Sequence, residues 1–342
     1  MTDPLAQCIQ LVSKPAEANA LLCVDVSNLA YRSAYAHETL FTTTGKRSGH
    51  IYGSIRSLIA VLENELCPGL KWCLVFCYDG PGAREKRQLI VPSYKANRDP
   101  NRFNPIPEVE EVLRLIPGLH IKQEGKEGDD SLAWIAQKCR DTKTIVLYTG
   151  DKDLWALIGK NVSVFSPNLK RYVLQKDIEE QYGITDCANI PLCKSLFGDS
   201  SDDIKGIERL QKRQVRPTIN VLAQGRGLVA MGVFLAALAQ EKPPEMTEKS
   251  YNKIIAERQR LMDNYAIIVP DLQGWHKESV VHVQKLEESV YHIHRSTENQ
   301  LKEILTRYEC FSLLGYIPKL LGEPIIVRDS IKERVENAIR QV

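Results

Sequence analysis

Short apolar segments alternate with segments of helical periodicity along the first half of the chain. Nearly continuous apolar runs at 21–26 ("LLCVDV"), 71–79 ("KWCLVFCYD") and 144–150 ("TIVLYTG") predict strands that are buried on both faces. Shorter strands are predicted at "LHIKQ" and "VSVFSP", and helices at 27–37, 50–66, 107–116, "SLAWIAQKCR", "DLWALI" and "KDIEEQYG", which ends at Gly183. This alternation predicts an α/β fold whose parallel sheet is wrapped by helices.

Strand signals fade after residue 185, where the chain becomes mostly helical. The longest apolar run, at 228–239, predicts a buried helix and is too short to cross a bilayer. Prolines and charged residues at 238–248 predict a linker. Beyond residue 265 we expect a strand in "ESVVHVQ" and helices near 298–307 and 330–341, without a predicted role.

Composition and the cysteine pattern indicate a soluble globular protein without a zinc site. Hydrophobic residues make up 43% of the chain and charged residues 26%, which is ordinary for such proteins. The nine cysteines include no CxxC or paired Cys/His motif. Their odd number, and an N-terminus without the basic start and apolar core of a signal peptide, favour free thiols in a reducing cytoplasm.

Basic residues concentrate in one segment, although the net charge of the chain is only +2. Between residues 205 and 226 the segment holds a single acid, Glu208, against six basic residues: Lys205, Arg209, Lys212, Arg213, Arg216 and Arg226. A basic strip beside an acidic cluster suits an enzyme that holds a polyanion and uses metal ions on it. An ordinary solvated surface is the alternative.

Nine carboxylates follow predicted strands or stand at a helix junction. They are Asp25, Asp79, Glu127, Asp129, Asp130, Asp151, Asp153, Asp199 and Asp202. Each one alone is explained by helix capping or turn chemistry. Because the carboxyl ends of parallel strands converge on one crevice, we expect the nine side chains to face one site, which capping does not require.

Such a cluster requires bound cations or protonated members. Two carboxylates ~4 Å apart repel each other by roughly 4 kcal/mol at an effective dielectric constant of about 20. Oxygen ligands without nearby His or Cys select hard ions such as Mg²⁺ or Mn²⁺. Two such ions can serve the hydrolysis of a phosphodiester. The carboxylates therefore predict a two-ion centre.

Five sequence blocks, in order over about residues 20–210, resemble those of a known family. They are "VDVSNLAYRSAY", "FCYDGPGAREKRQLIVPSYKANRD", "EGKEGDDSLAWIA", "YTGDKDLWALI" and "LFGDSSDDIKGI". They look like the blocks of the 5′ nucleases, which comprise the 5′→3′ exonuclease domain of bacterial DNA polymerase I, the bacteriophage 5′ exonucleases and the flap endonucleases. The family's "EADD" appears as Glu127–Asp130, its "TGDKD" unchanged at Thr149–Asp153, and its "GDxSDN" at Gly198–Asp203 with Asp203 in place of Asn. The resemblance implies a PIN-like core with a helical arch, two divalent ions, and cleavage of 5′ flaps and 5′ ends of DNA and often of RNA primers.

The resemblance also implies roles for single residues. It places Asp25, Asp79, Glu127, Asp129 and Asp151, with Asp130 nearby, at the first ion, and Asp153, Asp199 and Asp202 at the second. Lys95 and Arg98 are expected beside the scissile phosphate, and Tyr94 stacked on an unpaired base. Arg32 is expected on a phosphate, with a plain surface cation as the alternative. The arch is expected at about 95–120, with the helix at 107–116 inside it.

One departure concerns the helix–hairpin–helix that usually follows the last block in the family. Gly206 is kept, whereas Arg209 and Gln211 occupy positions where the family has glycine. Because residues other than glycine resist a positive φ, we expect a reshaped hairpin that has lost the family's potassium ion. Side chains would then contact the duplex, and the expected contacts are Lys205, Arg209, Lys212, Arg213 and Arg216.

These inferences divide the chain into an N-terminal extension at 1–20, a PIN-like nuclease domain at 21–200, a helix–hairpin–helix-like duplex-binding region at 201–240 and a C-terminal extension at 241–342. The predicted function is a free-standing, divalent-metal-dependent 5′→3′ exonuclease and flap endonuclease. We expect it to act in a bacteriophage replication system, in the host cytoplasm, on DNA and on RNA–DNA hybrids, without a membrane partner. Two alternatives stay open: a PIN-type ribonuclease, and a non-catalytic structure-specific DNA-binding protein.

Overall fold

The computed structural model describes residues 20–63, 72–99, 101–223, 230–272, 280–283 and 290–321. All but the last residue of the predicted extension at 1–20, and the whole predicted helix at 330–341, lie outside the described residues. Within the described ranges, no helix combines the length and the apolar character needed to span a membrane.

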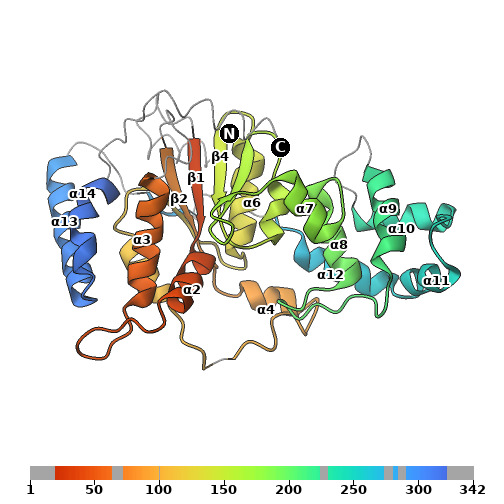
Figure 1. Ribbon diagram of the computed structural model, residues 1–342, viewed down its shortest axis with the longest axis horizontal. Coiled ribbons are helices and arrows are strands. Elements are labelled where there is room, and N and C mark those ends of the chain that lie inside the picture. Colours follow the sequence, from red (N-terminus) through yellow and green to blue (C-terminus); the bar gives the residue numbers. More distant parts are fainter. Residues whose placement is uncertain are drawn as a thin grey trace.

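A seven-stranded sheet forms the centre of the molecule (Figure 1). Its strand order is β6-β5-β4-β1-β2-β3-β7, with parallel pairing from β5 to β3 and antiparallel pairing of β6 and β7 at the two edges. The strands are β1 (Ala20–Asp25), β2 (Trp72–Cys77), β3 (Leu119–Ile121), β4 (Thr144–Tyr148), β5 (Val162–Ser166), β6 (Arg171–Tyr172) and β7 (Val280–Val283). The predicted α/β fold with a parallel sheet is confirmed.

Helices cover both faces of this sheet, which explains the continuous apolar runs of the central strands. In β1, Leu21 and Cys23 lie in the core cluster that includes α6 (Gly128–Cys139), whereas Leu22 and Val24 lie in the cluster of α2 and α3. Figure 1 shows α2 (Val26–Ala36) and α3 (Gly49–Glu63) on one side of the strands and α6, α7 and α8 on the other. The remaining elements on these two sides are α5 (Ile106–Leu113), η1 (Asp153–Leu157), α7 (Gln175–Tyr182), η2 (Cys187–Asn189) and α8 (Ile190–Phe197).

Local signals set most helix ends as predicted. The helix at 176–183 ends at Gly183, whose φ of 68° is left-handed and suits a residue without Cβ. The segment "DLWALI" forms a five-residue 3₁₀ helix, η1, in place of the predicted helix of α type. The carboxylate of Asp151 accepts from the backbone N–H of Asp153 at the start of η1, and β5 begins at Val162. The segment between them is therefore long enough for only a short 3₁₀ helix.

The segment expected to form the arch, about 95–120, is helical at α5, as the sequence predicted. Val109, Val112 and Leu113 of α5 are buried in the core with α2 and α3. Between α4 (Ala83–Gln88) and α5, the described residues from 92 to 105 form turns and loop without a helix. In Figure 1 this loop runs below the lower end of β1 from α4 toward α2 and α3. It therefore crosses the edge of the sheet at which β1 ends.

Residues after 200 form mostly helices, as predicted. They are α9 (Lys212–Ala223), α10 (Met231–Gln240), α11 (Glu248–Ala256), α12 (Arg258–Ile268), α13 (Val290–Arg307), η4 (Phe311–Tyr316) and α14 (Ile317–Leu320). The predicted strand in "ESVVHVQ" is β7, which pairs with β3. The prediction that the apolar run at 228–239 is a buried helix is wrong in part: α10 buries Met231, Phe234 and Leu238, but Val233 is 50% exposed. The run is apolar because it contains many small residues, but only one face of the helix packs against the rest of the protein.

Candidate metal centre

The central strands deliver carboxylates to one edge of the sheet. Asp25 ends β1 and is paired in register with Cys77, the last residue of β2, while Val24 pairs with Tyr148, the last residue of β4. Asp79 and Asp151 follow β2 and β4 within three residues. The sheet therefore brings three sequence-distant acids to adjacent strand ends, as the sequence predicted.

Asp25 is held in place from two directions. It is 5% exposed, and its two carboxylate oxygens accept from the backbone N–H of Asn28 (2.9 Å) and from the hydroxyl of Thr149 (2.8 Å). The first of these bonds makes Asp25 the N-cap of α2. Burial, and then the nearby charge of Asp151, raise the pKa of this carboxyl despite both bonds.

Asp129 and Asp151 share the same environment. Burial and the negative charges of Asp151 and Asp25 raise the pKa of Asp129 well above its ordinary value. Burial also raises the pKa of Asp151, against the opposing effect of Lys194. Neither acid forms an ion pair with another described residue. Asp79, the fourth acid here, accepts from the N–H of Gly128 and the hydroxyl of Ser27, each at 2.8 Å.

Glu127 and Asp130 are, in contrast, saturated by cations and by capping. Glu127 accepts from Lys95 (2.9 and 3.0 Å), from Arg87 (2.5 Å) and from the hydroxyl of Tyr94 (2.9 Å). Burial raises the pKa of Glu127, but Lys95 and Arg87 outweigh it, so the pKa lies below its ordinary value. Asp130 accepts from the N–H of Glu127 (2.8 Å), completing a capping box on α6, and from Arg87 (2.8 Å). Capping thus accounts for Asp130, while Asp129 of the same run lies with Asp25 and Asp151.

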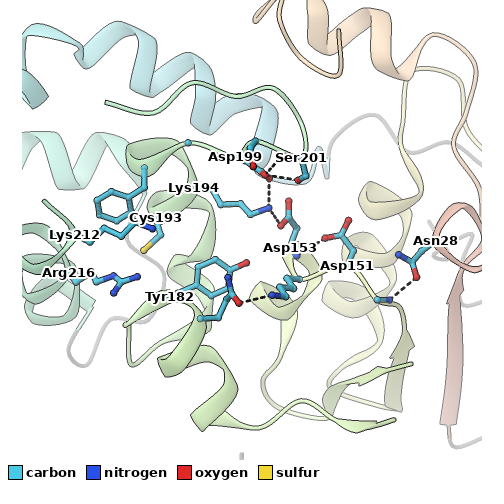
Figure 2. Close-up of a pocket in the computed structure, with 16 residues that line it drawn as sticks. Asn28, Asp151, Asp153, Tyr182, Cys193, Lys194, Asp199, Ser201, Lys212 and Arg216 are labelled. Carbon is cyan, nitrogen blue, oxygen red and sulfur yellow. Dashed lines mark hydrogen bonds and ion pairs between the residues drawn. The ribbon is translucent and has the colours of Figure 1, made fainter. Parts of the chain in front are cut away.

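A second acidic group consists of Asp153, Asp199 and Asp202. One carboxylate oxygen from each lies within 4.8 Å of the others. Lys194 of α8 ion-pairs with Asp153 and, at 2.5 Å, with Asp199 (Figure 2). Burial raises the pKa of Asp199, but the bonds from Lys194 and Ser201 bring it below its ordinary value. The structure thus brings together the three acids that the sequence assigned to one ion.

The loop that carries Lys95 and Arg98 is fastened to this second group. The N–H of Lys95 donates to the carbonyl of Asp202 (2.9 Å), and the N–H of Asn97 donates to the carboxylate of Asp203 (3.0 Å). Arg98 lies 3.2 Å from the carboxylate of Asp202, and the Lys95 ammonium lies 4.0 Å from it. Lys95 therefore lies between the two acidic groups, because it also pairs with Glu127, whereas Arg98 contacts only the second group.

Two predicted contacts are not where the sequence put them. The prediction that Tyr94 stacks on a base is wrong: its ring is 1% exposed and packs with Ile204 and Ile267. Arg32 turns toward the core, where its guanidinium donates to Ser57 and to the hydroxyl of Tyr148, each at 3.0 Å. Tyr94 thus anchors Glu127, and Arg32 braces α2 against β4.

A pocket of about 440 Å³ extends from the second acidic group toward the basic segment. Asp153 and Asp199 line one end of it, and Lys212 and Arg216 line the other (Figure 2). A second hollow, of about 620 Å³, lies on the other side of Asp199 and is lined in part by Lys205. Three of the predicted DNA contacts, Lys205, Lys212 and Arg216, therefore line the two hollows beside Asp199, while Arg209 and Arg213 are exposed and line neither.

The hairpin is the segment between α8 and α9, residues 198–211, and one of its residues other than glycine has a left-handed backbone conformation. Arg209 has a φ of 57°, so the expectation that a residue with a side chain would avoid this conformation is wrong. Gly206 is needed for a different reason: a Cβ there would come within 2.2 Å of the backbone of Phe197. The backbone of the hairpin lies directly against the end of α8, and this contact overrides the preference of Arg209.

Comparisons with known proteins agree with this geometry. Residues 20–183 match the family described as 5′-3′ exonuclease, N-terminal resolvase-like domain. A 5′-3′ exonuclease of Aquifex aeolicus is 32% identical over 193 residues, which are 55% of this chain and 64% of that protein. Over residues 20–183 the chain is therefore similar to the 5′ nuclease family. A thermostable DNA polymerase I of Thermus filiformis is also 32% identical, over 191 residues, 55% of this chain and 22% of that protein.

The likeness in fold extends beyond residues 20–183. A zinc-bound T5 5′-exonuclease is 20% identical, with a TM-score of 0.56 over 84% of this chain and 98% of that one. The fold is therefore PIN-like, with the helical region after the core included in the likeness. The chain spans less than two thirds of the length of the curated relatives named above.

Two cations at the acidic groups were not predicted from the sequence. Arg87 joins Glu127 to Asp130, and Lys194 joins Asp153 to Asp199. Lys194 stands in the last turn of α8, five residues before Asp199. A basic residue in a last helical turn that leads directly into an acidic block is a signal that could have identified it.

Proposed function

We propose that the protein is a divalent-metal-dependent 5′ nuclease that hydrolyses phosphodiesters of DNA at 5′ ends and 5′ flaps. The observation that supports it most is the pair of acidic groups with Lys95 between them and Arg98 on the second group. The metal-bound T5 5′-exonuclease, similar in fold, and the 5′-3′ exonuclease of Aquifex aeolicus support the same activity. Double-stranded flanks, and RNA–DNA hybrids as a second substrate, are part of the proposal.

The residues present fit divalent ions. Asp25, Asp129 and Asp151 have raised pKa values because burial and mutual repulsion oppose their charges, and no described cation lies within ion-pair distance of Asp25 or Asp129. A hard cation with oxygen ligands relieves both effects. We assign Asp25, Asp79, Asp129 and Asp151, with Glu127 behind them, to one Mg²⁺ or Mn²⁺ ion. Asp153, Asp199 and Asp202 are assigned to another, with the same preference for Mg²⁺ or Mn²⁺. Ions bound there supply Lewis acidity for phosphodiester hydrolysis.

The chain's own cations position the phosphate. Lys95 is charged at neutral pH, because Glu127 raises its pKa against the effect of burial. Its 12% exposed side chain is fixed by Glu127, so its charge is oriented before substrate arrives and needs little rearrangement. Arg98, 47% exposed, is free to move from Asp202 to a phosphate oxygen. Lys205, Lys212 and Arg216 would hold the duplex backbone on either side of Asp199.

Cleavage of a 5′-labelled flap duplex tests the proposal. With Mg²⁺ we expect short products near the flap junction, and we expect their loss in EDTA and in Asp151→Ala. Asp141→Ala is the matched control, since Asp141 is 72% exposed and pairs only with the surface residue Lys160 among described residues. An intact flap with cleavage of single-stranded RNA would favour a PIN-type ribonuclease. Tight flap binding without cleavage of either substrate would favour a DNA-binding protein without chemistry.

A further inference from the structure

Cationic side chains from the C-terminal helices occupy the hairpin between α8 and α9. Lys253 of α11 donates to the carbonyl of Glu208 (2.6 Å), and Arg260 of α12 donates to the carbonyl of Gly206 (3.2 Å). Asn264 of α12, only 2% exposed, donates to the carbonyl of Lys205 (3.0 Å). Three carbonyl oxygens within four residues of the hairpin are therefore each bonded to a side chain more than forty residues away in sequence.

The hairpin does not fit a potassium ion in this arrangement. An ion of that kind needs several carbonyl oxygens pointing into a shared space, and here the carbonyl oxygens of Lys205, Gly206 and Glu208 each already accept from a protein donor. Two of the three donors are cationic, and although Arg260 also pairs with Glu257 (3.1 Å), the charge of Lys253 would repel a bound cation. Among described residues Lys253 has no carboxylate partner, so its charge faces the hairpin uncompensated.

We infer that Lys253 and Arg260 act as built-in cations that hold the hairpin for duplex binding and make that binding independent of monovalent ions. The effect on the hairpin follows from peptide geometry. In a trans peptide the C=O and the next N–H point in opposite directions. Holding the carbonyl of Glu208 toward Lys253 therefore directs the N–H of Arg209, which no described residue accepts, to the opposite side.

The conformation of Arg209 fits this role. A left-handed conformation is unfavourable for a residue with a Cβ, and the chain keeps one here next to the carbonyl that Lys253 holds. The charge-assisted bond from Lys253 is large enough to offset that cost. The exposed guanidinium of Arg209 and its N–H then lie on one short turn, as donors of two kinds for a phosphate.

The inference rests on the proposed function only in requiring that a duplex binds, so binding is measured in EDTA, where no cleavage occurs. We expect equal affinity of the wild type for a flap duplex in KCl and in NaCl at matched ionic strength, because screening depends on ionic strength and not on the ion. Lys253→Ala should weaken duplex binding by about tenfold or more, since a charge-assisted bond is lost. The affinity of this variant should partly recover in KCl but not in NaCl. Lys253→Arg should restore the wild-type behaviour.

Lys249→Ala is the matched control, because Lys249 is an exposed lysine on the same helix without a contact to the hairpin among described residues. A wild-type affinity that is severalfold higher in KCl than in NaCl would overturn the inference. A loss in Lys253→Ala no greater than in Lys249→Ala would overturn it as well. Ion-independent binding without any flap cleavage would contradict the proposed function and leave this inference intact.

Discussion

Replacing Lys194 by Met removes the cation that joins Asp153 to Asp199 while keeping the length of the side chain. In the metal-free protein, three carboxylate oxygens lie within 4.8 Å of one another. At an effective dielectric constant of about 20, each pair of charges at that distance repels by about 3.5 kcal/mol. Lys194 opposes this repulsion from 2.5 Å at Asp199, with a side chain that is only 13% exposed.

Removing one partner of a buried ion pair typically costs about 3–5 kcal/mol. We therefore expect Lys194→Met to lower the free energy of unfolding by about 3 kcal/mol in EDTA at neutral pH. A divalent ion on the same carboxylates would take over the role of the ammonium. The difference in the free energy of unfolding between variant and wild type should then be smaller in Mg²⁺ than in EDTA. Mg²⁺ should therefore stabilise the variant more than it stabilises the wild type.

The pH dependence follows from the direction of the pKa shift. Because Lys194 lowers the pKa of Asp199 in the folded state, its stabilising effect is present above the unfolded pKa of about 3.9 and is lost as the pH falls through the lower folded value. Urea unfolding in EDTA and in Mg²⁺, at neutral and acidic pH, measures all three effects. Lys160→Met is the control, since Lys160 is a surface lysine in an ion pair whose partners are both 72% exposed. Equal stability of variant and wild type in EDTA, or a difference that Mg²⁺ leaves unchanged, would refute the reasoning.

Two further predictions concern the first acidic group. Tyr94→Phe should lower the free energy of unfolding by about 1–2 kcal/mol, because Glu127 loses a buried bond, yet leave flap affinity unchanged; unchanged stability would contradict the anchoring of Glu127 by this hydroxyl. The metal-free protein should lose stability as the pH rises from about 4, because the raised pKa of Asp25 means that the folded state holds its proton more tightly than the unfolded chain. Thermal melts in EDTA should show this slope in the wild type and a flatter one in Asp25→Asn, and identical slopes would contradict it.

The pattern of the sequence was sufficient for the sheet and for the position of the acids on it. Runs such as "LLCVDV" and "TIVLYTG" have the apolar continuity of strands covered on both faces, and the fold confirms them as β1 and β4. Parallel pairing then brings Asp25 and Asp151 to the same edge, whatever the details of the loops. These features depend on local pattern and on topology, both of which can be inferred from a single chain.

Features that depend on contacts between distant segments could not be predicted. Tyr94 lies beside Lys95 in the sequence and looks like an exposed stacking residue, but Ile204 and Ile267, more than a hundred residues away, bury its ring. Arg209 adopts a positive φ because the hairpin lies directly against α8 and is held by α11 and α12. In both cases a tertiary contact overrides a local preference.

The distribution of cations among the nine acids suggests where a metal is needed most. Glu127 and Asp130 are paired with Arg87 and Lys95, and Asp202 is paired with Arg98. Lys194 pairs with the other two acids of the second group, Asp153 and Asp199 (Figure 2). What remains are Asp25, Asp79, Asp129 and Asp151, which lie at or just after the ends of β1, β2 and β4 and at the start of α6. Asp25, Asp129 and Asp151 lie in the part of the chain that the structure describes without an ion pair, and all three have raised pKa values.

This difference has a consequence for the order of binding. At the second group an entering ion must displace the ammonium of Lys194, which already neutralises much of the negative charge. Part of the favourable free energy of ion binding is therefore lost. At the first group an entering ion displaces only protons, and its affinity increases as the pH rises through the raised pKa values. We therefore expect the ion at Asp25, Asp129 and Asp151 to bind more tightly and with the steeper pH dependence. The ion at Asp153, Asp199 and Asp202 should bind more weakly, and should be strengthened when a phosphate draws Lys194 away.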